Sequence, residues 1–113
     1  TAPTTSDERL AASVRASSGF LYYVSRLGVT GASASVADGA AAELARVKKA
    51  AGSLAVAYGF GISTPEQAAA AAKLADGVVV GSALVRLLEG TDPAAGCERL
   101  AASAAALAAA MRR

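Results

Sequence analysis

Residues 54–67 read LAVAYGFGISTPEQ, and this stretch decides the fold. An apolar run over 54–58 is followed by two closely spaced glycines and then by a Thr-Pro-Glu-Gln sequence at 64–67. Thr64 suits the N-cap of a helix, Pro65 its first turn, and Gln67 the reciprocal half of a capping box. The run is apolar at successive positions, which is typical of a parallel strand covered on both faces. The stretch therefore predicts a strand, a glycine-rich loop and a helix in direct succession.

Two further apolar runs, at residues 20–24 and 78–80, lie on either side of this unit. Helical patterns separate and follow the runs, and a capping box at 5–8 opens the first of them. The predicted helices span about residues 5–17, 38–50, 64–75, 82–89 and 92–113. Strands that alternate with helices imply a parallel sheet with right-handed crossovers. We therefore expect an α/β fold with three parallel strands and no internal domain boundary.

Length and composition limit the class of protein. The 113 residues suffice for one small domain, whereas a complete (β/α)8 barrel needs about 250. The longest apolar stretch, 100–111, is largely alanine, and a bilayer span would need about 20 strongly apolar residues. A net charge of +2 is too small to indicate nucleic acid binding. We expect one incomplete domain over residues 1–113, with neither a membrane nor a nucleic acid as partner.

The residue inventory also narrows the chemistry. The sequence has no histidine, which removes histidine-based triads and most zinc sites, so no metal is expected. Its single cysteine, Cys97, excludes an internal disulfide and is predicted to be a packed thiol in a cytosolic protein. No targeting signal is visible at the start of the sequence.

Glycine concentrates in three loops that should follow the strands, at residues 25–31, 59–63 and 81–82. Ligands of parallel α/β proteins bind at the carboxyl ends of the strands, where these loops meet. Gly81-Ser82 leads directly into a short helix, whose first N–H groups suit a phosphate. One glycine pair alone would indicate a tight turn, but three such loops on one edge favour an anion site. The acidic residues lie on helices, at helix starts or before a strand, so no convincing general acid or base is present.

Three phrases in the sequence resemble the tryptophan synthase α subunit family. Residues 19–31, GFLYYVSRLGVTG, are similar to its sixth strand and the loop that follows. Residues 59–67, GFGISTPEQ, are similar to the loop after its seventh strand, and residues 75–85, ADGVVVGSALV, to its eighth strand and phosphate helix. The resemblance covers essentially the whole chain. It implies the C-terminal part of a (β/α)8 TIM barrel, about strands 6–8 with their flanking helices.

The resemblance also implies an activity. Members of the family are cytoplasmic lyases of tryptophan biosynthesis that cleave indole-3-glycerol phosphate to indole and glyceraldehyde 3-phosphate by a retro-aldol step, without a cofactor. Indole then passes to a partner β subunit in an α2β2 complex. By motif, the substrate phosphate would be held by Gly31, Gly61, Gly81 and Ser82, and the indole ring by Tyr22 and Phe60. Thr30 would help to close its loop by engaging a catalytic aspartate, and Arg26 would lie on the same loop.

The family's catalytic glutamate and aspartate belong to its second strand and the loop beyond, which this sequence does not contain. The chain alone is therefore expected to be inactive. Its exposed strand edge and uncovered inner face are expected to favour self-association or domain swapping. Two alternatives stay open from the sequence: another phosphate-binding TIM-barrel enzyme, or a non-catalytic half-barrel that oligomerises.

Overall fold

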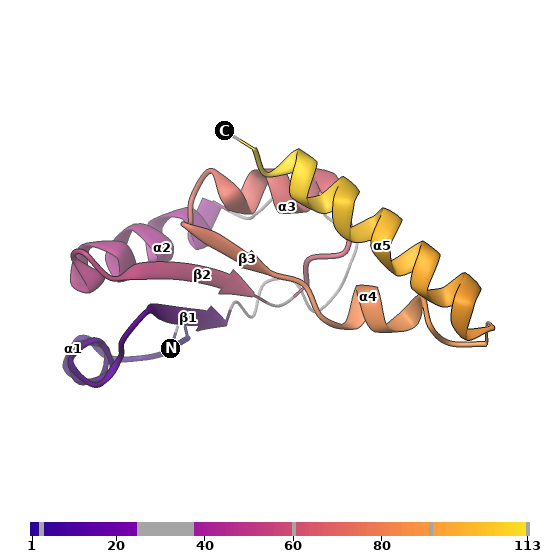
Figure 1. The fold of residues 1–113 in the computed structure, drawn as a ribbon. Helices are drawn as coiled ribbons and strands as arrows, with labels where there is room; N and C mark the ends of the chain where they lie inside the picture. The colour runs from indigo at the N-terminus through magenta and orange to yellow at the C-terminus, as the bar shows by residue number, and fades with distance from the viewer. Residues whose placement is uncertain (3, 25–37, 60, 91, 113) are drawn as a thin grey trace.

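A computed structural model describes residues 1–2, 4–24, 38–59, 61–90 and 92–112 of the chain (Figure 1). The described residues form a sheet of three parallel strands in the order β1-β2-β3, as predicted. The strands are β1 (Phe20–Val24), β2 (Ala55–Gly59) and β3 (Gly77–Val79). The helices are α1 (Asp7–Ala16), α2 (Asp38–Ala51), α3 (Pro65–Ala72), α4 (Ser82–Arg86) and α5 (Pro93–Ala110).

The limits of the strands follow from pairing rather than from apolar character. The prediction for β1 is confirmed, but β2 begins one residue later than predicted and β3 one residue earlier. Leu54 is held in the turn that ends α2, because its N–H donates to the carbonyl of Ala51 at 3.1 Å. At the other end of the sheet, Gly59 pairs with Val79, and this pair closes the ladder between β2 and β3.

Hydrogen bonds of individual side chains set the helix starts. The predicted capping box of α3 is confirmed, with Thr64 as N-cap and Gln67 reaching back. For α1, the predicted box at 5–8 is wrong by one residue. Ser6 is the N-cap and accepts from the N–H of Arg9, whereas the Thr5 hydroxyl accepts from the N–H of Ala2. The hydroxyls of Thr5 and Ser6 could each cap the helix, and the backbone conformation puts that of Ser6 at the N-cap.

Helix α4 ends at Arg86, three residues earlier than predicted. The next three N–H groups, those of Leu87, Leu88 and Glu89, each donate to the carbonyl three residues back, so the chain continues as tight turns. Helix α5 ends at Ala110, short of the predicted Arg113. These differences lie at the frayed ends of elements that the sequence identified correctly.

The core lies on one face of the sheet. Leu21, Tyr23, Val56 and Tyr58 share this outer face and are buried in the core cluster. Figure 1 shows the strands and the helices that pack around them. The helical residues buried in the same cluster include Leu10 of α1, Leu44 and Val47 of α2, Ala68 and Ala71 of α3, and Leu107 of α5. Small alanines on α3 allow this helix to approach the strands closely, which suits helix-on-sheet packing.

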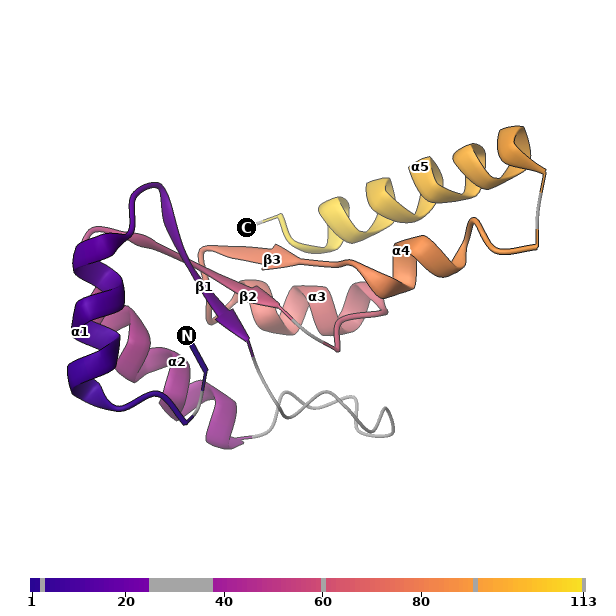
Figure 2. The same cartoon turned by 90° about the horizontal axis from the view of Figure 1, so that it is seen from below.

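The inner face of the sheet is open, as expected for part of a barrel, although the apolar runs of the strands are typical of strands covered on both faces. Phe20 is 56% exposed, Tyr22 38% and Val79 39%. All five helices leave this face free of a second apolar layer within the described residues. The radius of gyration, 15.2 Å, exceeds the roughly 13 Å of a compact domain of similar length. The described part of the chain is thus extended, and only one face of its sheet is covered by helices (Figure 2).

The prediction for Cys97, which lies on α5, is wrong. Cys97 is exposed on this helix and is not the packed thiol expected from the sequence. Of the residues of α5, only Gly96 and Leu107 are buried, because the helix packs along one side against α3 and α4 (Figure 2). Within the part of the chain that the structure describes, α5 and the shorter helices fall short of the length and apolar character that a membrane span needs.

Two sets of hydrogen bonds satisfy polar groups at the borders of the sheet. At the amino ends of the strands, the Asp76 carboxylate accepts from the N–H of Val56 at 2.9 Å and from Lys48 Nζ at 3.1 Å. At the free edge of β1, Thr1 donates to the carbonyl of Tyr22 and accepts from the N–H of Val24, both at 2.9 Å. The Thr1 pattern is that of a parallel strand partner.

Candidate functional site

The register of the sheet brings two glycine loops to the same edge. Gly59 and Val79 are direct partners at the carboxyl ends of β2 and β3. Gly61 lies two residues beyond Gly59, and Gly81 lies two residues beyond Val79, so both loops leave the sheet side by side (Figure 1). Four other residues of the predicted site, Arg26, Thr30, Gly31 and Phe60, lie outside the described residues.

Helix α4 begins with unused hydrogen-bond donors. Gly81 is its N-cap, and the carbonyl of Gly81 accepts from the N–H groups of Leu84 and Val85 at 3.0 and 3.1 Å. The hydrogen bonds among the described residues leave the N–H groups of Ser82 and Ala83, and the exposed hydroxyl of Ser82, without an acceptor. Such groups at a helix start attract an anion.

Gly61 has a backbone conformation that favours glycine. Its φ angle is +79°, in the left-handed region, and the residue is exposed at the edge where β2 ends. A residue with a β-carbon would be strained there. The hydrogen bonds among the described residues also leave its N–H unused. Gly61, Gly81 and Ser82 therefore lie at one edge of the sheet, where Gly61 and Ser82 carry donors that the described residues leave unused.

Tyr22 lies on the open inner face and reaches toward this edge. It pairs with Ala57 in the register, and its ring extends diagonally over Gly59 of the neighbouring strand. A β-carbon on Gly59 would come within 2.6 Å of the ring atoms Cε2 and Cζ of Tyr22. Gly59 is thus required for the ring to lie flat across β2. The sequence placed Gly59 in a loop and missed this role; the diagonal pairing of an aromatic residue with a strand glycine is the signal that could have revealed it.

The neighbouring tyrosine has a different role. Tyr23 points to the outer face, is fully buried, and packs against Tyr58 with ring centroids 6.0 Å apart. Within the described part of the chain, its hydroxyl has no hydrogen-bond partner. Burial raises the pKa of the Tyr23 phenol above its ordinary value of 10.0, and the nearby Glu43 carboxylate raises it further. Alternation along β1 therefore puts Tyr23 in the core and Tyr22 on the inner face beside the candidate site.

Several carboxylates are engaged in structural ion pairs away from this edge. Arg46 of α2 binds the carboxylates of Asp7 and Glu43 and the carbonyl of Thr5, which ties α2 to the start of α1. The hydrogen bond to Asp7, followed by that to Glu43, raises the pKa of the Arg46 guanidinium. Within the described ranges, no three His, Cys, Asp or Glu side chains gather as metal ligands would.

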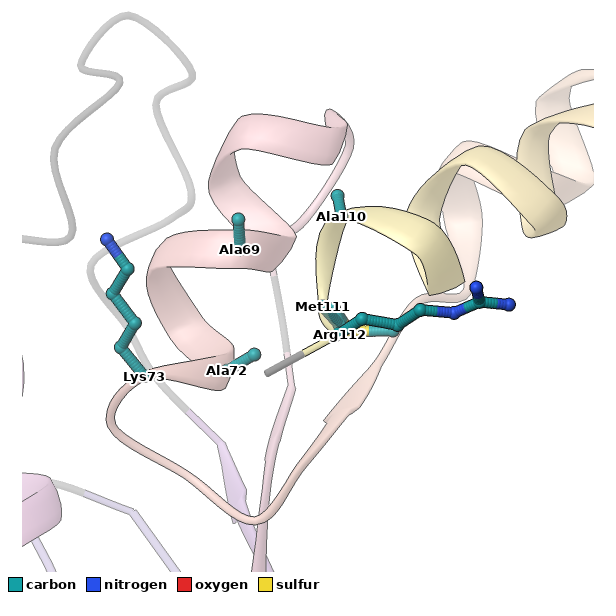
Figure 3. Close-up of a pocket in the computed structure, with 6 residues that line it drawn as sticks. All are labelled: Ala69, Ala72, Lys73, Ala110, Met111 and Arg112. Atoms are coloured by element: carbon teal, nitrogen blue, oxygen red, sulfur yellow. The ribbon is translucent and has the colours of Figure 1, made fainter.

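Two hollows lie away from the glycine loops. A shallow one of about 240 Å³ lies over the sheet between Phe20, Ala55 and Val79. Another, of about 360 Å³, lies between the carboxyl ends of α3 and α5 (Figure 3). Three of its six lining residues are alanines, and the side chains of Lys73 and Arg112 point away from each other. Neither hollow gathers converging polar groups, so the candidate site is the glycine edge with the inner face beside it.

This arrangement of parallel strands, outer helices and glycine loops at the carboxyl edge defines the C-terminal part of a (β/α)8 barrel. The family model described as "Tryptophan synthase alpha chain" matches residues 1–112. Over 106 residues the chain is 52% identical to the tryptophan synthase alpha chain of Novosphingobium aromaticivorans, covering 92% of this chain and 40% of the relative. Over 88 residues it is 58% identical to that of a Caulobacter species, covering 78% and 32%.

Solved structures agree with these sequence matches. A Mycobacterium tuberculosis tryptophan synthase superposes with a TM-score of 0.80 at 44% identity, over all of this chain and 40% of that one. The alpha chain of Legionella pneumophila gives a TM-score of 0.80 at 33% identity, over 98% and 40%. The chain belongs to the tryptophan synthase alpha chain family. It spans about a third to two fifths of the length of these relatives.

Proposed function

We propose that residues 1–113 supply the phosphate and indole contacts of a lyase that cleaves indole-3-glycerol phosphate to indole and glyceraldehyde 3-phosphate. The observation that supports the proposal is the registered pair Gly59 and Val79, beyond which Gly61 and Gly81-Ser82 follow at one edge of the sheet, where hydrogen bonds among the described residues leave the N–H groups of Gly61 and Ser82 unused. A phosphate bound between these loops would accept hydrogen bonds from both. Gly31, by its position in the family motif, would complete the phosphate site.

The inner face supplies the apolar part of the proposed site. The half-exposed ring of Tyr22 lies over Gly59, directly before the loop that carries Gly61. An indole ring stacked beside Tyr22 would stay within reach of a phosphate at the glycine edge. Phe60 would form another wall of this pocket, and Thr30 would help to close its loop over the substrate.

The proton-transfer groups of the reaction would come from outside this chain. Asp7, Glu43 and Asp76 are held in ion pairs with Arg46 or Lys48, so none of these three is free for acid or base work. We infer that the isolated chain is inactive and that the complete lyase is a cytoplasmic enzyme that needs no cofactor. Its partner would be a β subunit that accepts indole.

The open surfaces also suggest how the barrel domain would be completed. Thr1 already pairs with β1 in parallel, so a preceding strand would extend the sheet on this side. In isolation, the uncovered inner face and the free edge of β3 would favour association with a second copy. Sedimentation at several concentrations tests this point, and a concentration-independent monomer would contradict it.

A chimera tests the proposed activity. Residues 1–113 replace the matching segment of the Novosphingobium aromaticivorans α chain, and indole release from indole-3-glycerol phosphate is measured. We expect the chimera to release indole and residues 1–113 alone to release none. A soluble, folded chimera without indole release would contradict the proposed function, and indole release by the isolated chain would contradict the assignment of acid and base elsewhere.

A further inference from the structure

We propose that Gln67 is a positioning residue for the substrate phosphate, because it fixes the segment that presents the N–H of Gly61. The inference rests on the proposed function. Gln67 lies in the first turn of α3, and its side chain accepts hydrogen bonds from Ser63 and Thr64. Its effect would pass through the backbone of residues 61–64.

The side chain of Gln67 makes more hydrogen bonds than a helix cap requires. Its Oε1 atom accepts from the N–H of Thr64 at 3.2 Å, and the Thr64 hydroxyl accepts from the N–H of Gln67 at 3.2 Å. These two bonds complete the capping box. The same Oε1 also accepts from the N–H of Ser63 at 2.9 Å and from its hydroxyl at 3.1 Å. The additional bonds hold a residue that precedes the helix.

The segment is also fixed on the other side of Ser63. Ile62 is 8% exposed and belongs to the hydrophobic core, so its side chain anchors the backbone between Gly61 and Ser63. Gly59 is fixed in turn by its pairing with Val79. Gly61 therefore stands close to a core anchor on one side and a paired strand on the other. Releasing Ser63 would let the φ and ψ angles around Gly61 vary and turn its N–H away from the edge.

The chemistry of the side chain suits this position. A capping box accepts either glutamate or glutamine, and both provide the acceptor that Ser63 and Thr64 require. A glutamate would add a negative charge within a few residues of the proposed phosphate contact. Glutamine holds the same donors while remaining neutral, which agrees with an anion site nearby.

The test compares Gln67→Met with Ser6→Ala in the chimera. Methionine removes the acceptor at similar size, and Ser6→Ala removes the N-cap of α1, a cap outside the proposed site. We expect both variants to lose stability, whereas only Gln67→Met raises KM for indole-3-glycerol phosphate, by about tenfold with kcat within about twofold. The inhibition constant of inorganic phosphate should rise by the same factor. An unchanged KM, or a rise that Ser6→Ala shares, would overturn the inference while the proposed function stands.

A measurement on residues 1–113 themselves tests the first step. The ¹⁵N order parameter of the Gly61 N–H should be near the rigid value of about 0.85 and fall below about 0.6 in Gln67→Met. Gln67→Glu, which keeps the acceptor, should restore it, and Ser6→Ala should leave it unchanged. An order parameter that Gln67→Met does not move would show that Gln67 fixes nothing at Gly61. If the unsubstituted chimera releases no indole, the proposed function fails and the inference with it.

Discussion

The two ends of the sheet are built from different chemistry. At the amino ends, Asp76 closes the space between β2 and β3 by accepting from the N–H of Val56, and Lys48 pairs with the same carboxylate. At the carboxyl ends, the hydrogen bonds among the described residues leave the N–H groups of Gly61, Ser82 and Ala83 unused, and Gly61 has a positive φ angle. One end satisfies its polar groups within the chain, and the other keeps them available. From this comparison we expect stability to depend on the amino ends and binding on the carboxyl ends of the same strands, as is general in (β/α) barrels.

The largest expected effect is at the carboxyl end. In the chimera, Ser82→Asp places a negative charge against the proposed phosphate, and like charges brought together cost several kcal/mol in binding. We expect KM for indole-3-glycerol phosphate to rise by about 100-fold or more. Cys97→Asp adds the same charge at an exposed position of α5 and should leave KM unchanged. Equal KM values for the two variants would show that α4 does not receive the phosphate.

The matching change at the amino end should affect stability alone. Asp76→Ala in the chimera leaves the N–H of Val56 without its side-chain acceptor, and we expect a loss of about 1–3 kcal/mol in unfolding free energy. Asp76→Asn keeps an acceptor and removes only the charge opposite Lys48, a partly exposed pair, so the loss should stay below about 1 kcal/mol. Urea titration measures both. A change in KM for either folded variant would contradict the expectation that the amino ends of the strands affect stability alone.

Gly59→Ala should affect the position of Tyr22 more than the stability of the fold. The new methyl group would displace the ring, whose outer half is free to move on the open face. We expect KM for indole-3-glycerol phosphate to rise by about tenfold, with less than about 1 kcal/mol lost in unfolding free energy. In a double-mutant cycle, the substitution should add nothing to KM in a Tyr22→Ala background. Additive effects would mean that the two residues act separately.

The smallest expected effect is on the outer face, between the two ends. Tyr23→Phe removes a buried hydroxyl that has no partner, so the unfolding free energy should stay equal or rise by up to about 1 kcal/mol. The pKa of Tyr23 is raised in the folded protein, so above pH 10 the unfolded chain loses this proton while the folded chain retains it. Stability that is present below pH 10 is therefore lost as the pH rises further.

Urea titrations at pH 7 and at pH 10.5 check this sign. The advantage of Tyr23→Phe over the unsubstituted protein should grow with pH, because phenylalanine has no proton to release. An advantage that shrinks at high pH would mean that the folded state accommodates the phenolate. Measuring the difference between the two proteins removes the contributions of Tyr22 and Tyr58, which both proteins share.

The features that the sequence predicted well depend on neighbouring residues. The capping box of Thr64 and Gln67 closes within four positions, so its residues specify it directly.

The choice between Thr5 and Ser6 as N-cap failed because adjacent hydroxyls compete, and only the backbone conformation separates them. The ends of β2 and β3 shifted by one residue because ladder pairing with a distant strand sets them. Cys97 was assigned to the core, yet α5 packs along a single side and leaves it exposed.

The sequence by itself determined the alternation of strands and helices, the parallel sheet, the glycine loops and the family, because each is encoded in short runs of residues. Tertiary structure alone decided which face of the sheet is covered, which tyrosine enters the core, and that the ring of Tyr22 lies over Gly59. It also set the register that pairs Gly59 with Val79, whereas the common edge of the glycine loops was already expected from the sequence. The physical reason is that register and burial depend on contacts between segments about 20 or more residues apart, and a local pattern does not contain them.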